Sequence, residues 1–346
     1  MSTVRKVILV ILSVLALMVI AAYAFLQVQL NKINRINAQE TQFTTEDFDE
    51  DTTEEDTISE VNWGTIGKLQ EVKGVVNVLL VGQDTRDPGQ RARSDSMIIL
   101  SMNSNSKRLC MTSIMRDLYV QIPGYSNNKI NAAYAFGGFE LLDKTIETNF
   151  GIHIDYNVEV DFNGFMHIID ALGGIDIKLN EAEVAYMDGS SEYSDYSLQD
   201  PTPGLSVGYN HLDGEAALKY ARIRYVRTDN SHDDFGRTER QRVVIQTIFQ
   251  QVRQQPWTEL LNLYNAVVGD ITTDMTNDQI LSIGLTAYNL GADSISEYRI
   301  PEDNSYSGQR VHGMAVLVPN DWNVLRANLQ DFINGASNTP SADNAG

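Results

Sequence analysis

Arginine side chains gather in one short stretch of this chain, where they could bind an anion. The stretch holds Arg222, Arg224, Arg227, Arg237, Arg240 and Arg242. In a predicted helix, Arg237, Arg240 and Gln241 lie at positions i, i+3 and i+4, at the start of the stripe that would pack on the core. Arginine is rarely buried without a partner, and a helix N-terminus attracts anions. The spacing therefore predicts a phosphate or pyrophosphate site, with a surface network of ion pairs to Asp229, Asp233, Asp234 and Glu239 as the alternative.

Two aspartates flank the connection between the first two apolar runs. Asp84 follows the run that begins at Val75, and Asp95 precedes the run that begins at Ser96. Carboxylates at the two ends of a strand connection can converge on one point. Mg²⁺ takes one or two such carboxylates together with water and phosphate oxygens. The pair predicts a site for Mg²⁺, or for Mn²⁺, and the alternative is that both residues cap loops.

A further group of charged residues follows the third apolar run. Arg116 and Asp117 come directly after it, and Lys129 lies a short way further on. Ligands of open α/β sheets bind outside the ends of the strands. We therefore expect these side chains near the same anion.

Composition excludes several classes of protein. The 346 residues include 26 Lys plus Arg against 46 Asp plus Glu, for a net charge of -20. A nucleic-acid-binding domain needs a basic face, so we expect no nucleic-acid partner. The single cysteine, Cys110, excludes an intramolecular disulfide framework and any multi-cysteine metal site.

Alternating strand and helix patterns organise the rest of the chain. Short apolar runs predict strands at Val75–Val81, Ser96–Met102, Leu109–Met115, Asn157–Val160 and Ile175–Leu179. Helices are predicted at Phe139–Asn149, Phe162–Leu172, Gly214–Tyr220, Arg237–Gln254, Trp257–Val268, Asn277–Leu290 and Asp321–Phe332. This mixture predicts an α/β fold, an αβα sandwich with a central mixed sheet. The polar stretch between Asn180 and Tyr209 is either a surface excursion or an active-site loop.

The N-terminal region predicts a membrane anchor. Val7 to Leu26 carries no charge, and a helix of that length spans about 30 Å, the thickness of the hydrocarbon core. A cleaved signal peptide is the alternative, although its apolar core is usually shorter. Glu40 to Glu60 is acidic and free of Lys and Arg, which predicts a solvated linker rather than a Ca²⁺ site. We expect a single pass through the cell membrane, with the N-terminus in the cytoplasm and the folded part outside.

The predicted organisation has six parts. They are a cytoplasmic stub at 1–6, a transmembrane signal anchor at 7–28, an acidic extracellular linker at 29–62, a catalytic domain at 63–255, a C-terminal α/β extension at 256–335 and a disordered tail at 336–346. The extension either packs on the catalytic domain or forms a separate unit.

Several stretches, in this order, resemble the LytR-CpsA-Psr family of cell-envelope enzymes. They are LLVGQDTR from Leu79, RSDSMIIL from Arg93, SIMRDLYVQIPG from Ser113, KINAAYAFGG from Lys129, DALGGIDI from Asp170, LDGEAALKYARIR from Leu212 and DFGRTERQR from Asp234. The resemblance covers Val75 to Val252. One departure is Met115, where the family usually has proline.

The resemblance implies a hydrophobic tunnel for a polyprenyl chain and a Mg²⁺-dependent phosphotransferase, with pyrophosphate cleavage as a side activity. Such an enzyme moves an anionic glycopolymer, such as wall teichoic acid or capsule polysaccharide, from a polyprenyl-pyrophosphate carrier to a peptidoglycan sugar hydroxyl. It implies Asp84 and Asp95 as metal ligands, and Asp117 and Asp234 as candidate bases beside catalytic Arg93 and Arg116. The implied pyrophosphate-binding residues are Arg93, Arg116, Lys129, Arg222, Arg224, Arg237, Arg240 and Gln241. The alternatives are a membrane-anchored regulator of envelope genes and a glycan-binding protein without turnover.

Overall fold

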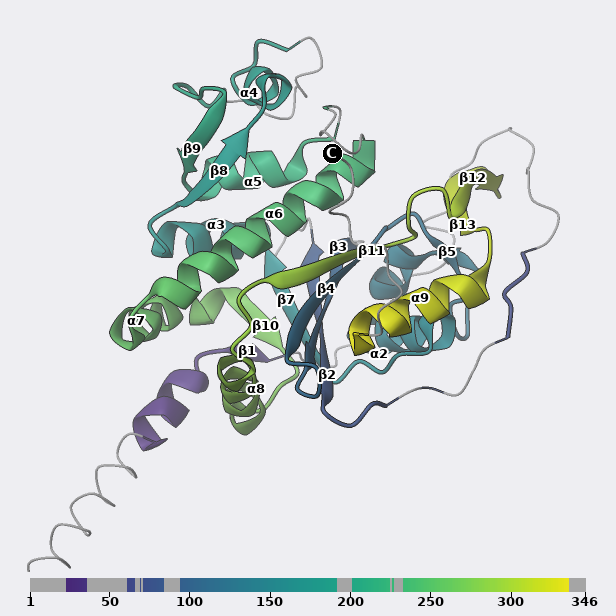
Figure 1. Ribbon diagram of the computed structural model, residues 1–346, viewed down its shortest axis with the longest axis horizontal. Helices are drawn as coiled ribbons and strands as arrows, with labels where there is room; N and C mark the ends of the chain where they lie inside the picture. Colours follow the sequence, from purple (N-terminus) through teal and green to yellow (C-terminus); the bar gives the residue numbers. More distant parts are fainter. Residues whose placement is uncertain are drawn as a thin grey trace, which may run out of the picture.

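A seven-stranded mixed sheet forms the centre of the molecule (Figure 1). The computed structural model describes residues 23–35, 61–65, 69, 71–83, 94–191, 201–224, 226 and 233–335. The strand order is β1-β10-β7-β2-β3-β4-β11. The central strands are β2 (Val75–Gln83), β3 (Ser94–Asn103), β4 (Arg108–Ile114) and β7 (Tyr156–Asp161). β2 is antiparallel to β3 and parallel to β7, which confirms the predicted mixed sheet.

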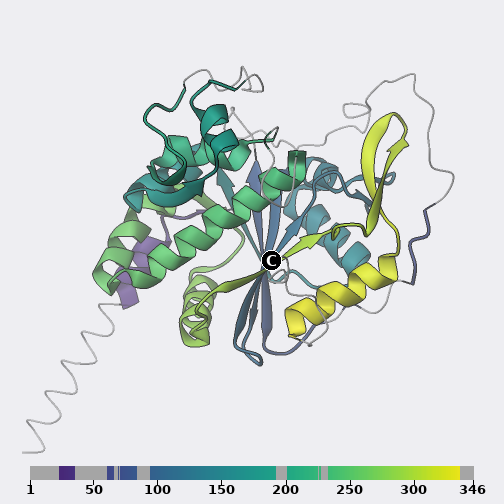
Figure 2. The ribbon, with the colours of Figure 1, turned by 45° about the horizontal axis from the view of Figure 1, so that its top comes forward.

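Alternating apolar residues give the sheet two buried faces. Leu79, Met97 and Ile99 point to one face, which is covered by α2 (Ile130–Phe150) and α9 (Trp322–Asn334). Ile98 and Met111 point to the other, which is covered by α6 (Asp233–Gln254) and α8 (Asn277–Leu290). Figure 2 shows α6 crossing the sheet on the side opposite α2 and α9. Helices on both faces confirm the expected αβα arrangement.

The helices start and stop at residues with a local physical reason. Asp161 caps the first turn of α3 (Phe162–Ala171), and Asp213 caps α5 (Gly214–Arg222). In α2, Gly137 and Gly138 leave the helical conformation, and the predicted helix Phe139–Asn149 corresponds to the part after this break.

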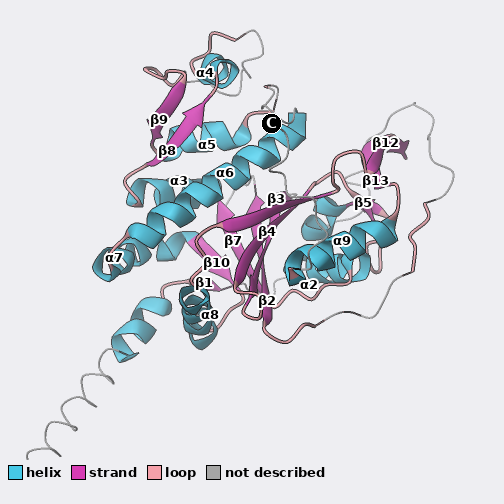
Figure 3. Ribbon diagram, viewed as in Figure 1, coloured by secondary structure: helices cyan, strands magenta, loops and turns pink. Residues whose placement is uncertain are grey.

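A smaller unit lies beyond one edge of the sheet (Figure 3). β8 (Ile175–Leu179) pairs with β9 (Gly208–Leu212) in a sheet of their own, and α4 (Glu181–Met187) follows β8. With α3 and α5 they enclose a second apolar core that Val244 of α6 completes. The polar stretch therefore contributes a helix and a strand to this unit, and residues 192–200 within it lie outside the described residues.

The C-terminal region is part of the central sheet rather than an extension. β10 (Ile271–Thr273) pairs with β7, and β11 (Ile295–Ile300) pairs along its length with β4. The region also contains α7 (Trp257–Val267), a short 3-10 helix η2 (Val268–Asp270) and the hairpin of β12 (Tyr306–Val311) and β13 (Met314–Pro319). Of the two predicted arrangements for residues 256–335, the pairing of β10 and β11 agrees with the one in which the region packs on the preceding domain.

The start of the predicted linker also belongs to the fold. β1 (Asn34–Arg35) pairs with β10, and Leu30 and Ile33 are buried against Val268. A second two-residue pair, β5 (Tyr119–Val120) and β6 (Asn128–Lys129), precedes α2. The acidic stretch from Glu40 to Glu60 and the tail 336–346 lie outside the described residues.

The predicted anchor lies largely outside the described residues, which begin within it at Tyr23. Residues 23–30 are helical. Among the helices that the structure describes, none combines the length and apolar composition of a membrane crossing.

Candidate functional site

A β-bulge lies at Asp95, at one end of the central strands. Gly82 pairs with Ser96 and Gln83 pairs with Ser94, so Asp95 is an extra residue in β3 without a partner on β2. A bulge redirects a side chain and ends regular pairing. Here it places a carboxylate at the end of the sheet where β4 also ends.

Arg116 connects this carboxylate to the start of α6. Its Nη1 donates to Asp95 Oδ1 at 2.7 Å, and its Nε donates to Asp234 Oδ2 at 2.8 Å. Burial alone would lower the pKa of Arg116, but the carboxylates of Asp234, Asp117 and Asp95 outweigh it and raise the pKa. The guanidinium is thus held between two carboxylates, in a fixed position at the end of β4.

Two further arginines converge on the same carboxylates. Arg237 Nη2 donates to Asp234 Oδ2 at 3.0 Å, and its Nη1 lies 3.9 Å from Asp95 Oδ1. Arg224 Nε lies 3.7 Å from Asp234 Oδ1, and its Nη2 lies 4.0 Å from Asp95 Oδ1. Three guanidiniums, from the segment after β4, from α6 and from the segment after α5, therefore share two carboxylates.

Arg237 is the most unusual member of this group because it is only 4% exposed. Its Nε is buried, and no described residue accepts a hydrogen bond from it. Burial, with the positive charges of Arg116 and Arg224, lowers the pKa of Arg237 to about 10, although Asp234 and Asp95 act in the opposite direction. A buried donor without an acceptor is costly, so a ligand oxygen beside Arg237 would be favourable.

Lys129 and Asp117 extend the cluster toward α2. Lys129 Nζ lies 3.2 Å from Asp117 Oδ1, and Arg116 Nε lies 3.7 Å from Asp117 Oδ2. We call Arg116, Lys129, Arg224 and Arg237, with Asp95, Asp117 and Asp234, the cationic cluster. The cluster thus brings together four cationic groups and three carboxylates.

Three residues predicted for the same site lie beside the cluster or apart from it. Gln241 Oε1 accepts a hydrogen bond from Ser96 Oγ at 3.1 Å, one residue from Asp95. The Arg222 guanidinium lies 4.5 Å from the centre of the Phe162 ring. Arg240 is fully buried, and its Nε donates to Glu183 at 2.7 Å.

Arg240 makes structural contacts with the backbone, and its predicted contact with a ligand stays a prediction. Its Nη1 and Nη2 donate to the carbonyl oxygens of Ile223 and Val226, at 3.2 and 3.0 Å. These carbonyls lie on either side of Arg224. Arg240 therefore holds the segment that carries a guanidinium of the cluster.

Sequence reasoning missed the partners that hold the site. Glu183 is 4% exposed and belongs to the capping box of α4, so its sequence pattern indicates only a helix start. Thr238 Oγ1 lies 3.4 Å from the sulfur of Met115, the residue that departs from the family pattern. Both Met115 and Thr238 are buried, and each is the chain neighbour of an arginine of the site, Arg116 and Arg237.

The predicted metal ligands are only partly described. Asp84 and Arg93 lie outside the described residues, and the described part of the chain holds no group of three or more metal-ligating side chains. Among the described residues, the ion pairs of Asp95 all involve Oδ1. One carboxylate of this kind fits Mg²⁺ that is shared with phosphate oxygens, because Mg²⁺ needs few protein ligands.

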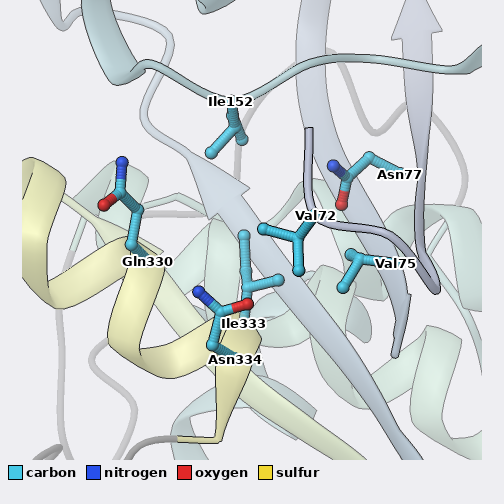
Figure 4. A pocket seen from close by; sticks show the side chains of 7 residues that line it. All are labelled: Val72, Val75, Asn77, Ile152, Gln330, Ile333 and Asn334. Carbon is cyan, nitrogen blue, oxygen red and sulfur yellow. The ribbon is translucent and has the colours of Figure 1, made fainter. Parts of the chain in front are cut away.

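A small cleft lies at the other end of β2, away from the cluster (Figure 4). It is lined by Val72, Val75, Asn77, Ile152, Gln330, Ile333 and Asn334. No charged side chain lines it, so it lacks the chemistry of the cationic cluster.

The fold and the cluster together define an α/β protein with a cationic site at the end of a mixed sheet. The chain matches the LytR_cpsA_psr family over residues 32–326 and belongs to that family. The match extends beyond the motifs that carry the resemblance in the sequence, and it includes the strands β1, β10 and β11.

Curated relatives carry two kinds of name. The chain is 31% identical over 262 residues to regulatory protein MsrR of Staphylococcus aureus, covering 75% of each chain. It is 32% identical over 272 residues to the polyisoprenyl-teichoic acid–peptidoglycan teichoic acid transferase TagU of Oceanobacillus iheyensis, covering 77% of this chain and 78% of the relative.

Solved structures share the fold. Bacillus subtilis TagV is 26% identical with a TM-score of 0.58, covering 76% of this chain and 99% of TagV. The LytR-CPS2A-psr family protein YwtF (TagT), solved with bound octaprenyl pyrophosphate lipid, is 24% identical with a TM-score of 0.56 over 80% of this chain and 94% of YwtF. The second likeness shows the fold alone.

Proposed function

We propose that this protein is a membrane-anchored phosphotransferase that moves an anionic glycopolymer from a polyprenyl-pyrophosphate carrier to a peptidoglycan sugar hydroxyl. The observation that carries the proposal is the convergence of three guanidiniums on two carboxylates, where no described residue offers an acceptor to the buried Nε of Arg237. A pyrophosphate supplies the missing acceptors and negative charge. The transferase name of the TagU relative supports the same reaction class.

The cluster performs this chemistry by position and charge. In the transfer, the sugar oxygen forms a bond to the phosphorus that bears the glycopolymer, and the bond from that phosphorus to the bridging oxygen breaks. Polyprenyl phosphate leaves with the electron pair. Phosphoryl transfer needs little covalent help, and guanidiniums bind phosphate oxygens in bidentate fashion. Arg116, Arg224 and Arg237 therefore orient the pyrophosphate and neutralise the charge on the leaving oxygen.

The proton of the sugar hydroxyl needs an acceptor, and Asp117 is the better of the two predicted bases. Asp234 Oδ2 accepts hydrogen bonds from both Arg116 and Arg237, so its role is to hold these guanidiniums. Asp117 Oδ1 pairs with Lys129 Nζ at 3.2 Å, while Oδ2 lies 3.7 Å from Arg116 Nε, beyond hydrogen-bond distance, and is the oxygen that can take the proton. We assign the proton to Asp117.

Mg²⁺ is the metal that the donor set suits. Asp95, together with Asp84, would hold it. When bound, the ion neutralises charge on the pyrophosphate oxygens.

The apolar side chains behind the cluster suit an isoprenoid chain. Leu80, Leu100 and Ile245 are only partly buried, although they belong to the layer between the sheet and α6. Partly exposed apolar surface can be covered by an apolar ligand. The glycopolymer and the acceptor position are open to the assay below.

The experiment measures transfer by the full-length protein in vesicles. The donor is a polyprenyl-pyrophosphate-linked wall teichoic acid precursor, and the acceptor is a peptidoglycan oligomer. Loss of one transition-state donor costs ~3 kcal/mol, so Arg116→Ala and Arg224→Ala should each lower the rate about a hundredfold. Arg253→Ala is the matched control, because Arg253 pairs with Asp293 at the surface, at the last turn of α6.

Full transfer activity in both cluster variants would overturn the assignment. Tight binding of the donor without release of polyprenyl phosphate would point to a glycan-binding protein instead. The capsule alternative is tested with a capsule-linked donor in the same assay, and omission of Mg²⁺ tests the metal.

A second candidate is a regulator of envelope genes, which the name of the MsrR relative favours. Protease protection of the folded part in intact cells would support it. Digestion from outside supports the extracellular transferase.

A further inference from the structure

The exposed side of α8 is uncharged in a strongly acidic protein. After Asp278, in its first turn, no charged residue occurs through Ala292. Two large apolar side chains of this helix face solvent: Leu285 is 62% exposed and Tyr288 is 82% exposed. A helix face of this composition needs an apolar or interfacial partner.

The helix at residues 23–30 is bound to the start of α8. Tyr23 donates its hydroxyl to Asp278 Oδ1 at 3.0 Å, and Gln27 donates to the same oxygen at 3.1 Å. Leu30 is buried nearby, in a cluster that Leu281 of α8 packs against. Figure 1 shows this helix and α8 beside β1, on the opposite side of the molecule from β9. The two helices therefore lie in contact.

This surface carries further apolar groups. Phe25 is 52% exposed and Val28 is 62% exposed. The surface formed by helix 23–30 and α8 is named here the α8 surface, and Phe25, Val28, Leu285 and Tyr288 are its exposed apolar residues.

The predicted anchor identifies the partner. Its uncharged run extends from Val7 to Leu26, so Tyr23 lies inside the run, only about 5 Å of helix from its end. The first turn of α8 is hydrogen-bonded to Tyr23 and therefore lies at the same level. If the run crosses the bilayer, α8 is at the membrane surface.

We propose that the α8 surface rests on the outer face of the bilayer and contacts the boundary between headgroups and acyl chains. Tyrosine is enriched at this boundary because its ring is apolar and its hydroxyl is polar. The absence of charge from Gln279 to Ala292 avoids the cost of desolvating ions there. The inference rests on the anchor of the proposed function and adds the orientation of the domain.

The orientation has a consequence for the lipid substrate. Leu290, at the end of α8, shares an apolar cluster with Met102 and Leu109. These two residues lie at the ends of β3 and β4 that are far from the cationic cluster. The neighbouring strand β2 has nine residues, so the cationic cluster lies about 30 Å from these strand ends. The partly buried apolar layer between the sheet and α6 runs from one end of the central strands to the other. An isoprenoid tail can therefore remain near the bilayer while its pyrophosphate reaches the arginines.

The test uses nitroxide labels on the full-length chain. In a Cys110→Ala background, Tyr288→Cys and Tyr209→Cys are labelled separately and reconstituted in vesicles of phosphatidylethanolamine and phosphatidylglycerol. Tyr209 is the matched control because it is 77% exposed and lies on β9, away from α8. Electron paramagnetic resonance measures how accessible each label is to oxygen, which concentrates in lipid, and to a water-soluble nickel complex.

Reconstitution should raise the ratio of oxygen to nickel accessibility at position 288 and leave it unchanged at position 209. An aqueous ratio at both positions, in protein that floats with the vesicles, would overturn the surface but leave the transferase intact. Loss of both accessibilities at 288 would show contact with a second copy, and failure to float would show that the anchor is absent. Either result would also overturn the proposal.

Discussion

The two faces of the central sheet are built differently. We call the face under α2 and α9 the sealed face. Nearly all residues of its apolar core are buried, among them Leu79, Leu142 and Trp322. On the face under α6 and α8, named here the open face, partly buried residues outnumber the buried ones. Leu80 and Leu100 of adjacent strands are among them.

This difference separates stability from function within one sheet. A sealed layer contributes its full burial to folding, at about 25 cal/mol per Å² of apolar surface. A partly exposed layer contributes less and keeps apolar surface available for a ligand. The cationic cluster lies at the end of the sheet, where α6 of the open face begins.

The largest effect should follow from removing the proposed base at the end of the sheet. We expect Asp117→Asn to lower the transfer rate ~10²- to 10⁴-fold, because a positioned base contributes that much. The melting temperature should change little. Asp176→Asn is the control, since Asp176 is 72% exposed and pairs with His211 on β8 and β9. Rates measured at saturating donor that stay equal in both variants would exclude Asp117.

The next effect concerns the buried ion pair between Glu183 of α4 and Arg240 of α6. Glu183→Ala leaves the Arg240 guanidinium buried without its carboxylate, which should lower the free energy of unfolding by about 3–5 kcal/mol. Glu215→Ala removes the pair that the exposed Glu215 makes with Lys219 one helical turn away, and it should cost ~0.5 kcal/mol or less. Urea denaturation compares the two variants. Similar costs would mean that Arg240 finds water or another acceptor.

The two faces can be compared directly with one truncation on each. Leu142→Ala on the sealed face should cost about 2–5 kcal/mol through a cavity. Leu100→Ala on the open face should cost less, because its side chain is already partly exposed. The specific activity of folded Leu142→Ala protein should be unchanged. Equal destabilisation by both truncations would contradict the distinction between the faces.

The smallest effect is a pH dependence that arises from α2. Burial raises the pKa of Asp143 to about 7, and the nearby carboxylate of Asp274 adds to the rise. The hydrogen bond that Asn157 donates to Asp143 acts in the opposite direction. The unfolded chain loses this proton near pH 3.9, so the folded state binds more protons between about pH 4 and pH 7. Stability from this group therefore falls as the pH rises through that window.

Asp143→Asn should remove this dependence. Relative to the variant, the native protein should lose about 1 kcal/mol of stability between pH 5 and pH 8, allowing for partial solvent access. Thermal unfolding at both pH values gives the comparison, with the exposed Asp303→Asn as control. A native protein whose stability relative to the variant is the same at both pH values would refute the shift.

Much of the central fold could be predicted because its strands are short apolar runs. The predicted bounds of β8 and α8 match the structure, and those of β2, β3 and β4 differ by one or two residues. β11 could not be recognised, since Glu297 and Arg299 interrupt its apolar residues at a partly exposed edge. β10 and β1 are too short to show a period and form only through pairing with β7 and with each other.

The site could be predicted only as a set of charges. Local spacing placed Arg237 at the start of a buried helix, and Arg116 at the end of a strand. The role of Arg240 depends on Glu183, which is 57 residues away, and nothing in the local sequence links them. The bulge at Asp95 depends in the same way on the register between β2 and β3.

The hydrogen bonds of Arg240 also affect how tightly a ligand can bind. By holding the carbonyls of Ile223 and Val226, this buried side chain fixes the backbone on both sides of Arg224 before any ligand arrives. Ordering a flexible side chain on binding costs about 0.5–1.5 kcal/mol, and ordering backbone costs more. The backbone that carries Arg224 is thus preorganised for binding. Part of the entropy that a mobile loop would lose on binding is already lost when the protein folds.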